Sequence, residues 1–173
     1  KKEQAAKEKA ELSHGALLVE PGMNSFSKAV EEAKEKKLKR LFLKSGVHDE
    51  EGKEVVIDFA LKVVGQNKDD VKIRAGLKIK GKKEEDVFLS DCTVTGAKKS
   101  GVYGDSAAMH LKNVRVEKCG EHGVKVYSTK RNTMTDCNVN NNKGSGVFVG
   151  GGGRMTIDGS ATTIHHNVTG GDS

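Results

Sequence analysis

Carboxylate, amide and lysine side chains that could take part in chemistry recur at a regular interval in this sequence. Asp91, Asn113 and Asp136 are separated by 22 and 23 residues, and Lys125 lies between the last two. A carboxylate can act as a general base, and a lysine near it can neutralise an anionic substrate. Asp136 and Lys125 are therefore the candidate catalytic residues.

The same acidic column also has a structural interpretation. Asp and Asn at the start of a strand commonly satisfy the backbone of a turn, and a repeated sequence supplies one such residue in each repeat. A calcium-assisted site would instead need several acidic groups held together. The turn interpretation is the stronger of the two, so we expect a protein that is not an enzyme.

An aromatic and basic column is the main candidate for binding. Tyr103, Lys125 and Phe148 are separated by 22 and 23 residues, in a chain with only 4% aromatic residues. If each repeat places its residue on one outer face, the three form a strip on which a sugar ring or a partner's side chains could stack. Strands favour aromatic residues in any case, so the pattern is also compatible with an ordinary solvent face.

Two polar motifs suggest a metal or phosphate site, and neither fits one well. His48 is followed by three acidic residues, but four consecutive side chains in a loop cannot all face one ion. The glycine run at 150–153 precedes Arg154, without the Lys-Ser/Thr of a phosphate-binding loop. We expect a solvated loop and a flexible turn at these places, and no metal or cofactor.

Three columns of residues share one repeat. The intervals are 22, 23 and 25 residues, and the columns are Gly101, Gly123, Gly146 and Gly171; Val94, Val116, Val139 and Ile164; and Cys92, Val114, Cys137 and Thr162. Such a period, with short strands between glycines and polar turns, is typical of a solenoid in which each repeat forms one coil. Alternation along a strand would point both valines of Gly-Val-x-Val inward and the x residue outward.

The repeat assigns structural roles to three residue types. We expect each glycine to take positive φ at a sharp turn. Asn142 and Asn167 fall in one column and would stack in a hydrogen-bonded ladder. Cys92 and Cys137 lie two coils apart, about 9.6 Å at about 4.8 Å per coil, which is too far for a disulfide. We expect them to be small buried hydrophobic residues.

The elements that carry these columns follow from the periodicity. Residues 1–20 read as a polar helical tail or linker without an apolar stripe. A helix over about 24–38 has apolar residues at helical spacing, and from Leu41 onward the pattern becomes that of short alternating strands. The sequence predicts one all-β domain over residues 21–173, which includes this helix. The C-terminal repeat carries no cap, which leaves its strand edges free to pair.

The coils "CTVTGAKKSGVYG", "VRVEKCGEHGVKVYS" and "CNVNNNKGSGVFVG", together with the helix before them, resemble the right-handed parallel β-helix of the pectin-lyase-like superfamily. They are similar in particular to β-helix repeats of F-box-associated and carbohydrate-active proteins. The resemblance covers about residues 24–173 and implies a right-handed parallel β-helix (β-solenoid) with an N-terminal capping α-helix. It is weak for function, because this fold carries lyases, hydrolases, epimerases and non-catalytic binding modules.

Composition limits the partners and the compartment. The net charge is +6, but Lys and Glu alternate and aromatics do not interleave with them, so we expect a solvated surface and no nucleic acid partner. Three cysteines without a Cys-x-x-Cys pair favour an intracellular compartment, and no segment is typical of a membrane span. An anionic surface bound by Lys78, Lys80, Lys82 and Lys83 is a minor alternative.

The function that the sequence favours is a non-enzymatic interaction scaffold or binding module. Its partner would be a protein, within a larger complex, or a polysaccharide. The alternative is a carbohydrate-active enzyme, that is, a lyase, epimerase or hydrolase that acts on an acidic polysaccharide. For that alternative, the resemblance implies a base near the sugar C5 proton and a cation for the carboxylate.

Overall fold

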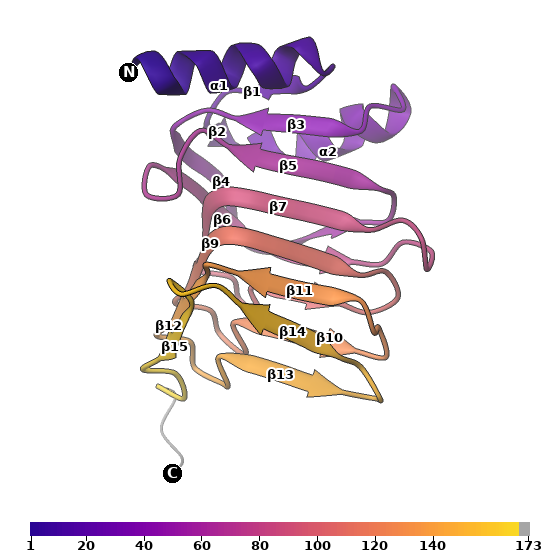
Figure 1. Cartoon of the computed structure of the whole chain (residues 1–173), viewed down its shortest axis with the longest axis vertical. Coiled ribbons are helices and arrows are strands. Elements are labelled where there is room, and N and C mark those ends of the chain that lie inside the picture. Colours follow the sequence, from indigo (N-terminus) through magenta and orange to yellow (C-terminus); the bar gives the residue numbers. More distant parts are fainter. Residues whose placement is uncertain (170–173) are drawn as a thin grey trace.

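The chain is wound into a parallel β-solenoid with three sheets (Figure 1). The structure, a computed structural model, describes residues 1–169. Over these residues it has two helices and fifteen strands. Every strand pair is parallel, and each strand pairs with the strand at the equivalent place in the next coil. The all-β solenoid expected from the repeat is thus confirmed.

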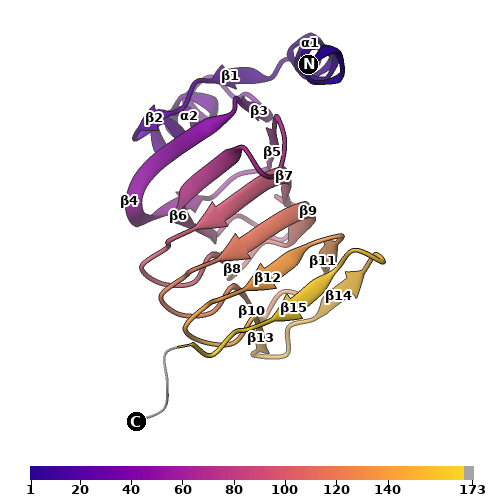
Figure 2. The same ribbon diagram turned by 90° about the vertical axis from the view of Figure 1, so that its left-hand side faces the viewer.

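The coils from β3 to β13 cross three sheets in the same order, and Figure 2 shows the strands of sheet 2 stacked from β4 down to β15. Sheet 1 consists of β1 (Leu17–Val19), β3 (Arg40–Leu43), β5 (Leu61–Gly65), the first parts of β7 (Val87–Thr95) and β9 (Met109–Glu117), β11 (Asn132–Thr135) and β14 (Met155–Asp158). Sheet 2 consists of β2 (Gly22–Met23), the first parts of β4 (Gly46–Ile57) and β6 (Val71–Ile79), the second parts of β7 and β9, β12 (Asn138–Asn140) and β15 (Thr163–His165). Sheet 3 consists of the ends of β4 and β6, β8 (Val102–Gly104), β10 (Val124–Tyr127) and β13 (Val147–Gly150).

The core is a narrow stack of aliphatic side chains inside the coils. Val124 and Val126 are fully buried, as the Gly-Val-x-Val pattern predicts. The inward columns of the other sheets, such as Val94, Val116 and Val139, are buried as well. Cys92, Cys119 and Cys137 are free and buried; burial raises the pKa of the Cys119 thiol to about 11. The cysteines therefore fill the core, as expected, and are not thiolates at neutral pH.

The acidic column lies at the corner between sheets 1 and 2. Asp91, Asn113 and Asp136 all adopt left-handed backbone conformations, with φ of 56°, 53° and 52°. This conformation turns the chain sharply in a single residue, and Asn and Asp tolerate it better than other residues with a side chain. The Asn113 amide donates to Asp91 Oδ1 at 2.7 Å. The turn interpretation of this column is therefore the one that the geometry bears out.

The glycine column has a different cause from the one that the sequence suggested. Gly101, Gly123 and Gly146 are not among the residues with positive φ. Instead, a Cβ on Gly101 would lie 2.5 Å from Val116 Cγ1, and the other two glycines face the same kind of contact with the next coil. The expectation of positive φ is therefore wrong for these three: they are glycines because coils approach too closely for a side chain. Gly171 lies outside the described residues.

The asparagine ladder is present and joins three coils. Asn142 is fully buried, and its Oδ1 accepts from the Cys119 backbone N–H at 3.0 Å. Its amide donates to Asn167 Oδ1 at 2.9 Å. Loop backbone groups that have no strand partner are satisfied in this way.

Helix α2 (Ser25–Glu35) closes the N-terminal end of the solenoid. Phe26, Ala29, Val30 and Ala33 are spaced on one helical face and join the core. Neither Asn24 nor Ser25 caps the helix by its side chain. Instead the buried Glu50 accepts from the N–H groups of Phe26 and Ser27, at 3.0 and 2.9 Å. A carboxylate at this end is favourable because the first N–H groups of a helix have no partner in the helix and its dipole is positive there.

The predicted polar segment forms helix α1 (Lys2–Ser13), which buries none of its side chains. It lies along the outer face of sheet 1 (Figures 1 and 2). Lys7 bonds Asp91 at 2.8 Å and the carbonyl of Gly65 at 2.7 Å, and Glu11 pairs with Arg40 at 2.9 Å. The helix is therefore docked through polar contacts.

β1 also pairs with β3, so the solenoid begins before residue 21, the expected boundary. Neither helix over residues 1–169 is long and apolar enough to cross a membrane.

The last described coil is open. Val149, Ile157 and Ile164 occupy inward positions, but they are 42%, 45% and 43% exposed. β13, β14 and β15 each pair with one neighbouring strand within residues 1–169. Within residues 1–169, these apolar side chains and the outer edges of β13, β14 and β15 thus lie at the end of the stack.

Candidate functional site

The outer face of sheet 3 carries the predicted strip. Tyr103, Lys125 and Phe148 are direct neighbours across β8, β10 and β13, and Lys78 precedes them on β6. The Lys125 Nζ lies 4.9 Å from the Tyr103 ring centroid and 5.9 Å from that of Phe148. Lys78 Nζ lies 5.5 Å from the Tyr103 ring. Cations and aromatic rings therefore alternate along one row, in which they attract each other.

Neighbouring side chains hold both rings of the strip. The Tyr103 hydroxyl donates to Asp105 at 3.3 Å, and burial together with this carboxylate raises the pKa of the phenol, so it stays neutral. The His122 ring stacks on Phe148 with centroids 4.8 Å apart and accepts a bond from the Ser145 N–H at Nδ1. Burial and the Lys125 charge lower the pKa of His122. A neutral imidazole thus supports Phe148, which is 39% exposed.

The two candidate catalytic residues are not brought together. Lys125 is on β10 of sheet 3, whereas Asp136 is at the corner between sheets 1 and 2, opposite that face. Asp136 Oδ1 accepts from the Ala161 N–H at 3.2 Å. The pair cannot act on one sugar residue, because the core separates the two side chains. Asp136 therefore has a turn role, and Lys125 belongs with the strip.

The polar motif at His48 is part of strand β4, and the expectation of a solvated loop there is wrong. His48 and Glu50 point inward and are buried, whereas Asp49 and Glu51, which alternate with them, are half-buried and exposed, respectively. His48 bonds Ser25 Oγ at 2.9 Å and the Lys44 carbonyl at 3.0 Å. Both buried side chains thus form hydrogen bonds with α2, and His48 also bonds the segment just before β4. No group of three His, Cys, Asp or Glu in the described part of the chain is placed to hold a metal ion.

The glycine run forms a turn, as expected. β13 ends at Gly150, and Gly151 and Gly152 follow with φ of 58° and 75°. The Gly153 N–H then donates to the Gly150 carbonyl at 2.9 Å. This bond closes the turn with groups of the turn itself.

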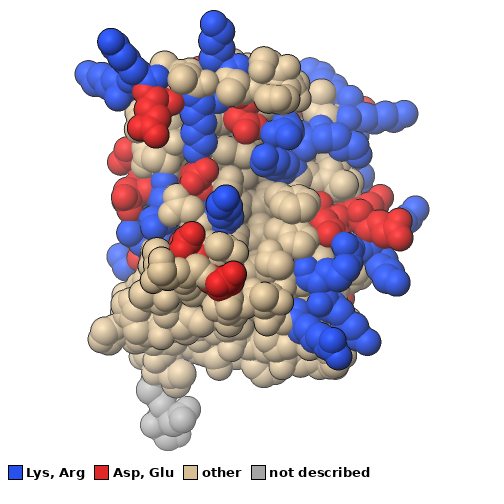
Figure 3. Space-filling view, in the orientation of Figure 1, with Lys and Arg blue, Asp and Glu red and all other residues tan. Residues whose placement is uncertain are grey.

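Sheet 1 carries a groove that the sequence did not reveal. It has a volume of ≈ 430 Å³, within the range of small-molecule sites. In Figure 3, charged side chains gather over the upper part and the right-hand margin of this face, and its lower left part is uncharged. The groove lining comes from α1, β5, β7, β9 and β11: Lys7, Glu11, Lys62, Val64, Phe88, Leu89, Ser90, Asp91, His110, Leu111, Lys112, Thr133 and Thr135.

A chain of hydrogen bonds fixes His110, which is part of the groove lining. His110 Nε2 lies 3.0 Å from Asp86 Oδ2, and Nδ1 lies 2.9 Å from Thr133 Oγ1. Arg131 holds the other oxygen of Asp86 at 2.7 Å. Because a carboxylate only accepts, Nε2 carries the proton of a neutral ring and the Thr133 hydroxyl donates to Nδ1. His110 also stacks on Phe88, with centroids 4.5 Å apart.

Thr133, His110 and Asp86 are connected in the same order as the nucleophile, the base and the orienting acid of a catalytic triad. Acyl transfer also needs donors that stabilise an oxyanion. Here β9 and β11 are paired with strands on both sides, so their backbone N–H groups are used in the sheet. The arrangement therefore suits a rigid aromatic platform better than a nucleophile.

The sequence contained a signal for this groove. Phe88, His110 and Thr133 are 22 and 23 residues apart, the same intervals as in the glycine column. They form one outward column of sheet 1. Their side chains differ in chemical type, so the column is visible only when the repeat is extended to every outward position.

One family model matches the chain. It describes the right-handed β-helix region and covers residues 63–171. Comparison with curated proteins and with solved structures finds no match. The match covers more than half of the 173 residues and agrees with the stacked parallel sheets. The chain therefore belongs to the right-handed β-helix family, as its resemblance to pectin-lyase-like parallel β-helices suggested.

Proposed function

We propose that this β-helix is a non-enzymatic binding module, and that the row Lys78, Tyr103, Lys125 and Phe148 on sheet 3 binds an acidic polysaccharide. The observation that carries the proposal is the position of Lys125 between two rings, 4.9 Å from Tyr103 and 5.9 Å from Phe148. A row of alternating cations and rings suits a ligand that itself presents both negative charge and ring faces.

The spacing of the row supports this ligand. Neighbouring coils lie about 4.8 Å apart, so the row offers a charge or a ring at each step. Every residue of a polyuronate chain has a carboxylate and a ring with C–H groups that can pack on an aromatic face. The Lys78 ammonium lies 3.9 Å from Glu54, whereas Lys125 makes no ion pair within residues 1–169. Lys125 is therefore the cation available to a carboxylate.

A titration with oligogalacturonate tests the proposal, and the fully methyl-esterified oligomer serves as the neutral control ligand. We expect the acid form to bind and the ester to bind much more weakly, with affinity that falls as salt rises. Lys125→Met and Phe148→Ala should each weaken binding about tenfold, which is the loss of one ion contact or one ring contact.

Phe88→Ala is the matched control, because Phe88 is a comparably exposed phenylalanine on sheet 1. It should leave oligogalacturonate binding unchanged. Equal affinity for acid and ester, or unchanged binding by both sheet 3 variants, would contradict the proposal. Shortened or unsaturated oligomers after the titration would instead support the alternative of a carbohydrate-active enzyme.

A further inference from the structure

We propose that the groove on sheet 1 is a separate site for a small anionic ligand with a planar ring, as in a nucleotide or an aromatic acid. The site lies on a different face from the sheet 3 row and does not depend on what that row binds. Its elements are an exposed ring on a fixed support, two lysines that have no acidic partner within residues 1–169, and a wall formed by α1.

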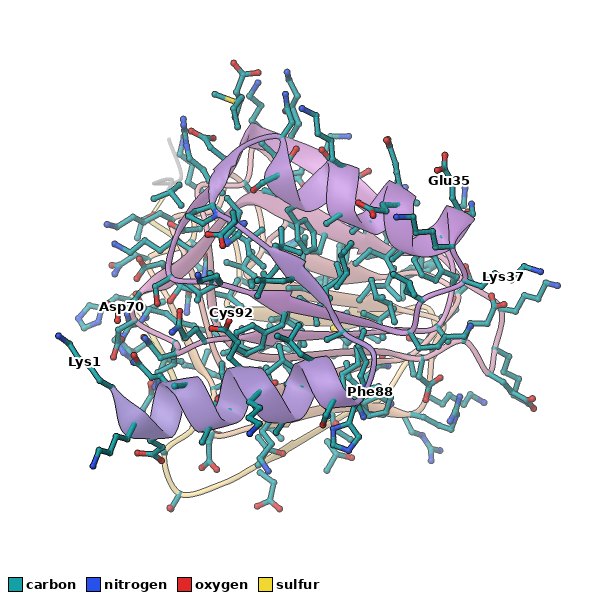
Figure 4. The ribbon with its side chains drawn as sticks, turned by 90° about the horizontal axis from the view of Figure 1, so that it is seen from above. Lys1, Glu35, Lys37, Asp70, Phe88 and Cys92 are labelled. Atoms are coloured by element: carbon teal, nitrogen blue, oxygen red, sulfur yellow. The ribbon has the colours of Figure 1, made fainter. Side chains whose placement is uncertain are left out.

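The ring platform is fixed before any ligand arrives. Phe88 is 47% exposed, and one face of its ring stacks on His110 with an angle of 19° between the planes. His110 is held at both nitrogens, by Asp86 and by Thr133. Figure 4 shows Phe88 on the side of the solenoid along which α1 runs. The exposed part of the Phe88 ring can therefore contact a planar ligand, with little freedom to lose on binding.

The charges that line the groove favour an anion. Both lining acids are already paired: Glu11 with Arg40 at 2.9 Å, and Asp91 with Lys7 at 2.8 Å. Lys62 and Lys112, in contrast, line the groove and make no ion pair within residues 1–169. Two unpaired ammonium groups remain, so the groove attracts a phosphate or carboxylate.

The positions of these groups match one ligand. Lys62 is the direct neighbour of Phe88 across β5 and β7, and Lys112 neighbours Ser90 and Thr135 in the adjacent column. The hydroxyls of Ser90 and Thr135 line the same groove and can donate to an anion. The volume of ≈ 430 Å³ is sufficient for a mononucleotide or an aromatic acid.

Calorimetric titrations with four probes test the site. AMP and 4-hydroxybenzoate carry both a ring and an anion, adenosine carries only a ring system without charge, and inorganic phosphate is only an anion. We expect at least one of the first two to bind, and adenosine and phosphate to bind at least about tenfold more weakly than that probe. The ratio of the affinities for AMP and 4-hydroxybenzoate then shows whether the site prefers the phosphate of a nucleotide or the carboxylate of an aromatic acid.

Variants of the full chain locate the binding. Phe88→Ala and Lys112→Met should each lower the affinity for the probe that binds by about tenfold, because each removes one ring contact or one ion contact. Tyr127→Ala is the matched control, since it removes an aromatic ring of comparable exposure that lies on β10, outside both the groove and the sheet 3 row. Circular dichroism should show the same fold for all three. Three results would each overturn the proposal. They are no binding of either AMP or 4-hydroxybenzoate, binding of phosphate or adenosine as tight as that of the better of these two probes, and an affinity for that probe that Phe88→Ala leaves unchanged.

Discussion

A Cβ on Gly123 would lie 2.5 Å from Cγ1 of Val139 in the next coil. The same atom would lie 2.7 Å from the Asn142 amide nitrogen and 2.7 Å from the Gly146 carbonyl oxygen. This contact explains why the glycine and valine columns have the same phase. Each glycine leaves the space into which a valine and an asparagine of the next coil pack.

Gly123→Ala should therefore destabilise the fold by overpacking, by about 1–3 kcal/mol. The free energy of unfolding in urea measures the effect. Lys143→Ala is the control, because Lys143 is exposed in a neighbouring loop and its side chain makes no hydrogen bond within the described residues. That variant should remain within about 0.5 kcal/mol of the parent chain. Equal stability of both variants would show that the coils can separate to admit a methyl group.

Asn142→Ala should be among the most destabilising polar substitutions in the chain. It removes the acceptor of the Cys119 N–H and the donors to the Val116 carbonyl and to Asn167. Buried groups left without partners cost about 1–3 kcal/mol each. Hydrogen exchange should show faster exchange at the Cys119 amide in particular. If this amide exchanges as in the parent chain, Asn142 does not hold the loop.

Acid should destabilise the N-terminal coil through His48. Burial lowers the folded pKa of His48 from its ordinary value of 6.5, because the charged ring would lie beside α2 without water. The unfolded chain then binds more protons as the pH falls below about 6.5. The stabilisation is complete above that value and is lost as the pH falls toward the folded pKa.

The variant His48→Gln should remove this part of the pH dependence. Because the pKa of His122 is also lowered, the comparison must be between the pH slopes of the variant and the parent chain in urea unfolding. The parent should lose more stability than the variant between about pH 6.5 and pH 5. Equal slopes would mean that His48 can be protonated without unfolding.

Salt should loosen helix α1. Its contacts with sheet 1 include the ion pairs Lys7–Asp91 and Arg40–Glu11, and it buries no side chain. Pairs of this kind contribute up to about 1 kcal/mol each and weaken as salt rises. Hydrogen exchange of residues 2–13 should accelerate between roughly 0.05 and 1 M NaCl, and Glu11→Gln should accelerate it at low salt. The amides of Val124 and Val126 serve as internal references and should not change.

The sequence predicted the solenoid well because its core is repetitive. The valine and cysteine columns recur in one phase, and inward residues must be apolar in every coil. It predicted the wrong reason for Gly123, since close contact and positive φ both select glycine. The observed φ of Gly123 and the packing of Val139 and Asn142 against it distinguish the two causes.

The candidate sites were predictable to different degrees. The strip at Tyr103, Lys125 and Phe148 was visible because aromatic and basic residues are conspicuous in a column. The sheet 1 groove was not, because α1 lines it through Lys7 and Glu11, and a polar helix gives no sign of where it docks. The separation of Asp136 from Lys125 also required the structure, since linear spacing does not say which face a corner residue adjoins.

The equivalence of the coils has a consequence for how this protein can change in length. Removal of residues 102–123 would join Gly101 to Val124, which is the junction that Gly101 already makes with Val102. The inward columns would continue without interruption, because Val124 pairs where Val102 did. On the outer face, Tyr103 would be lost and Lys125 would lie beside Lys78. Insertions and deletions of one whole coil can thus replace the residues offered to a ligand while the topology is preserved.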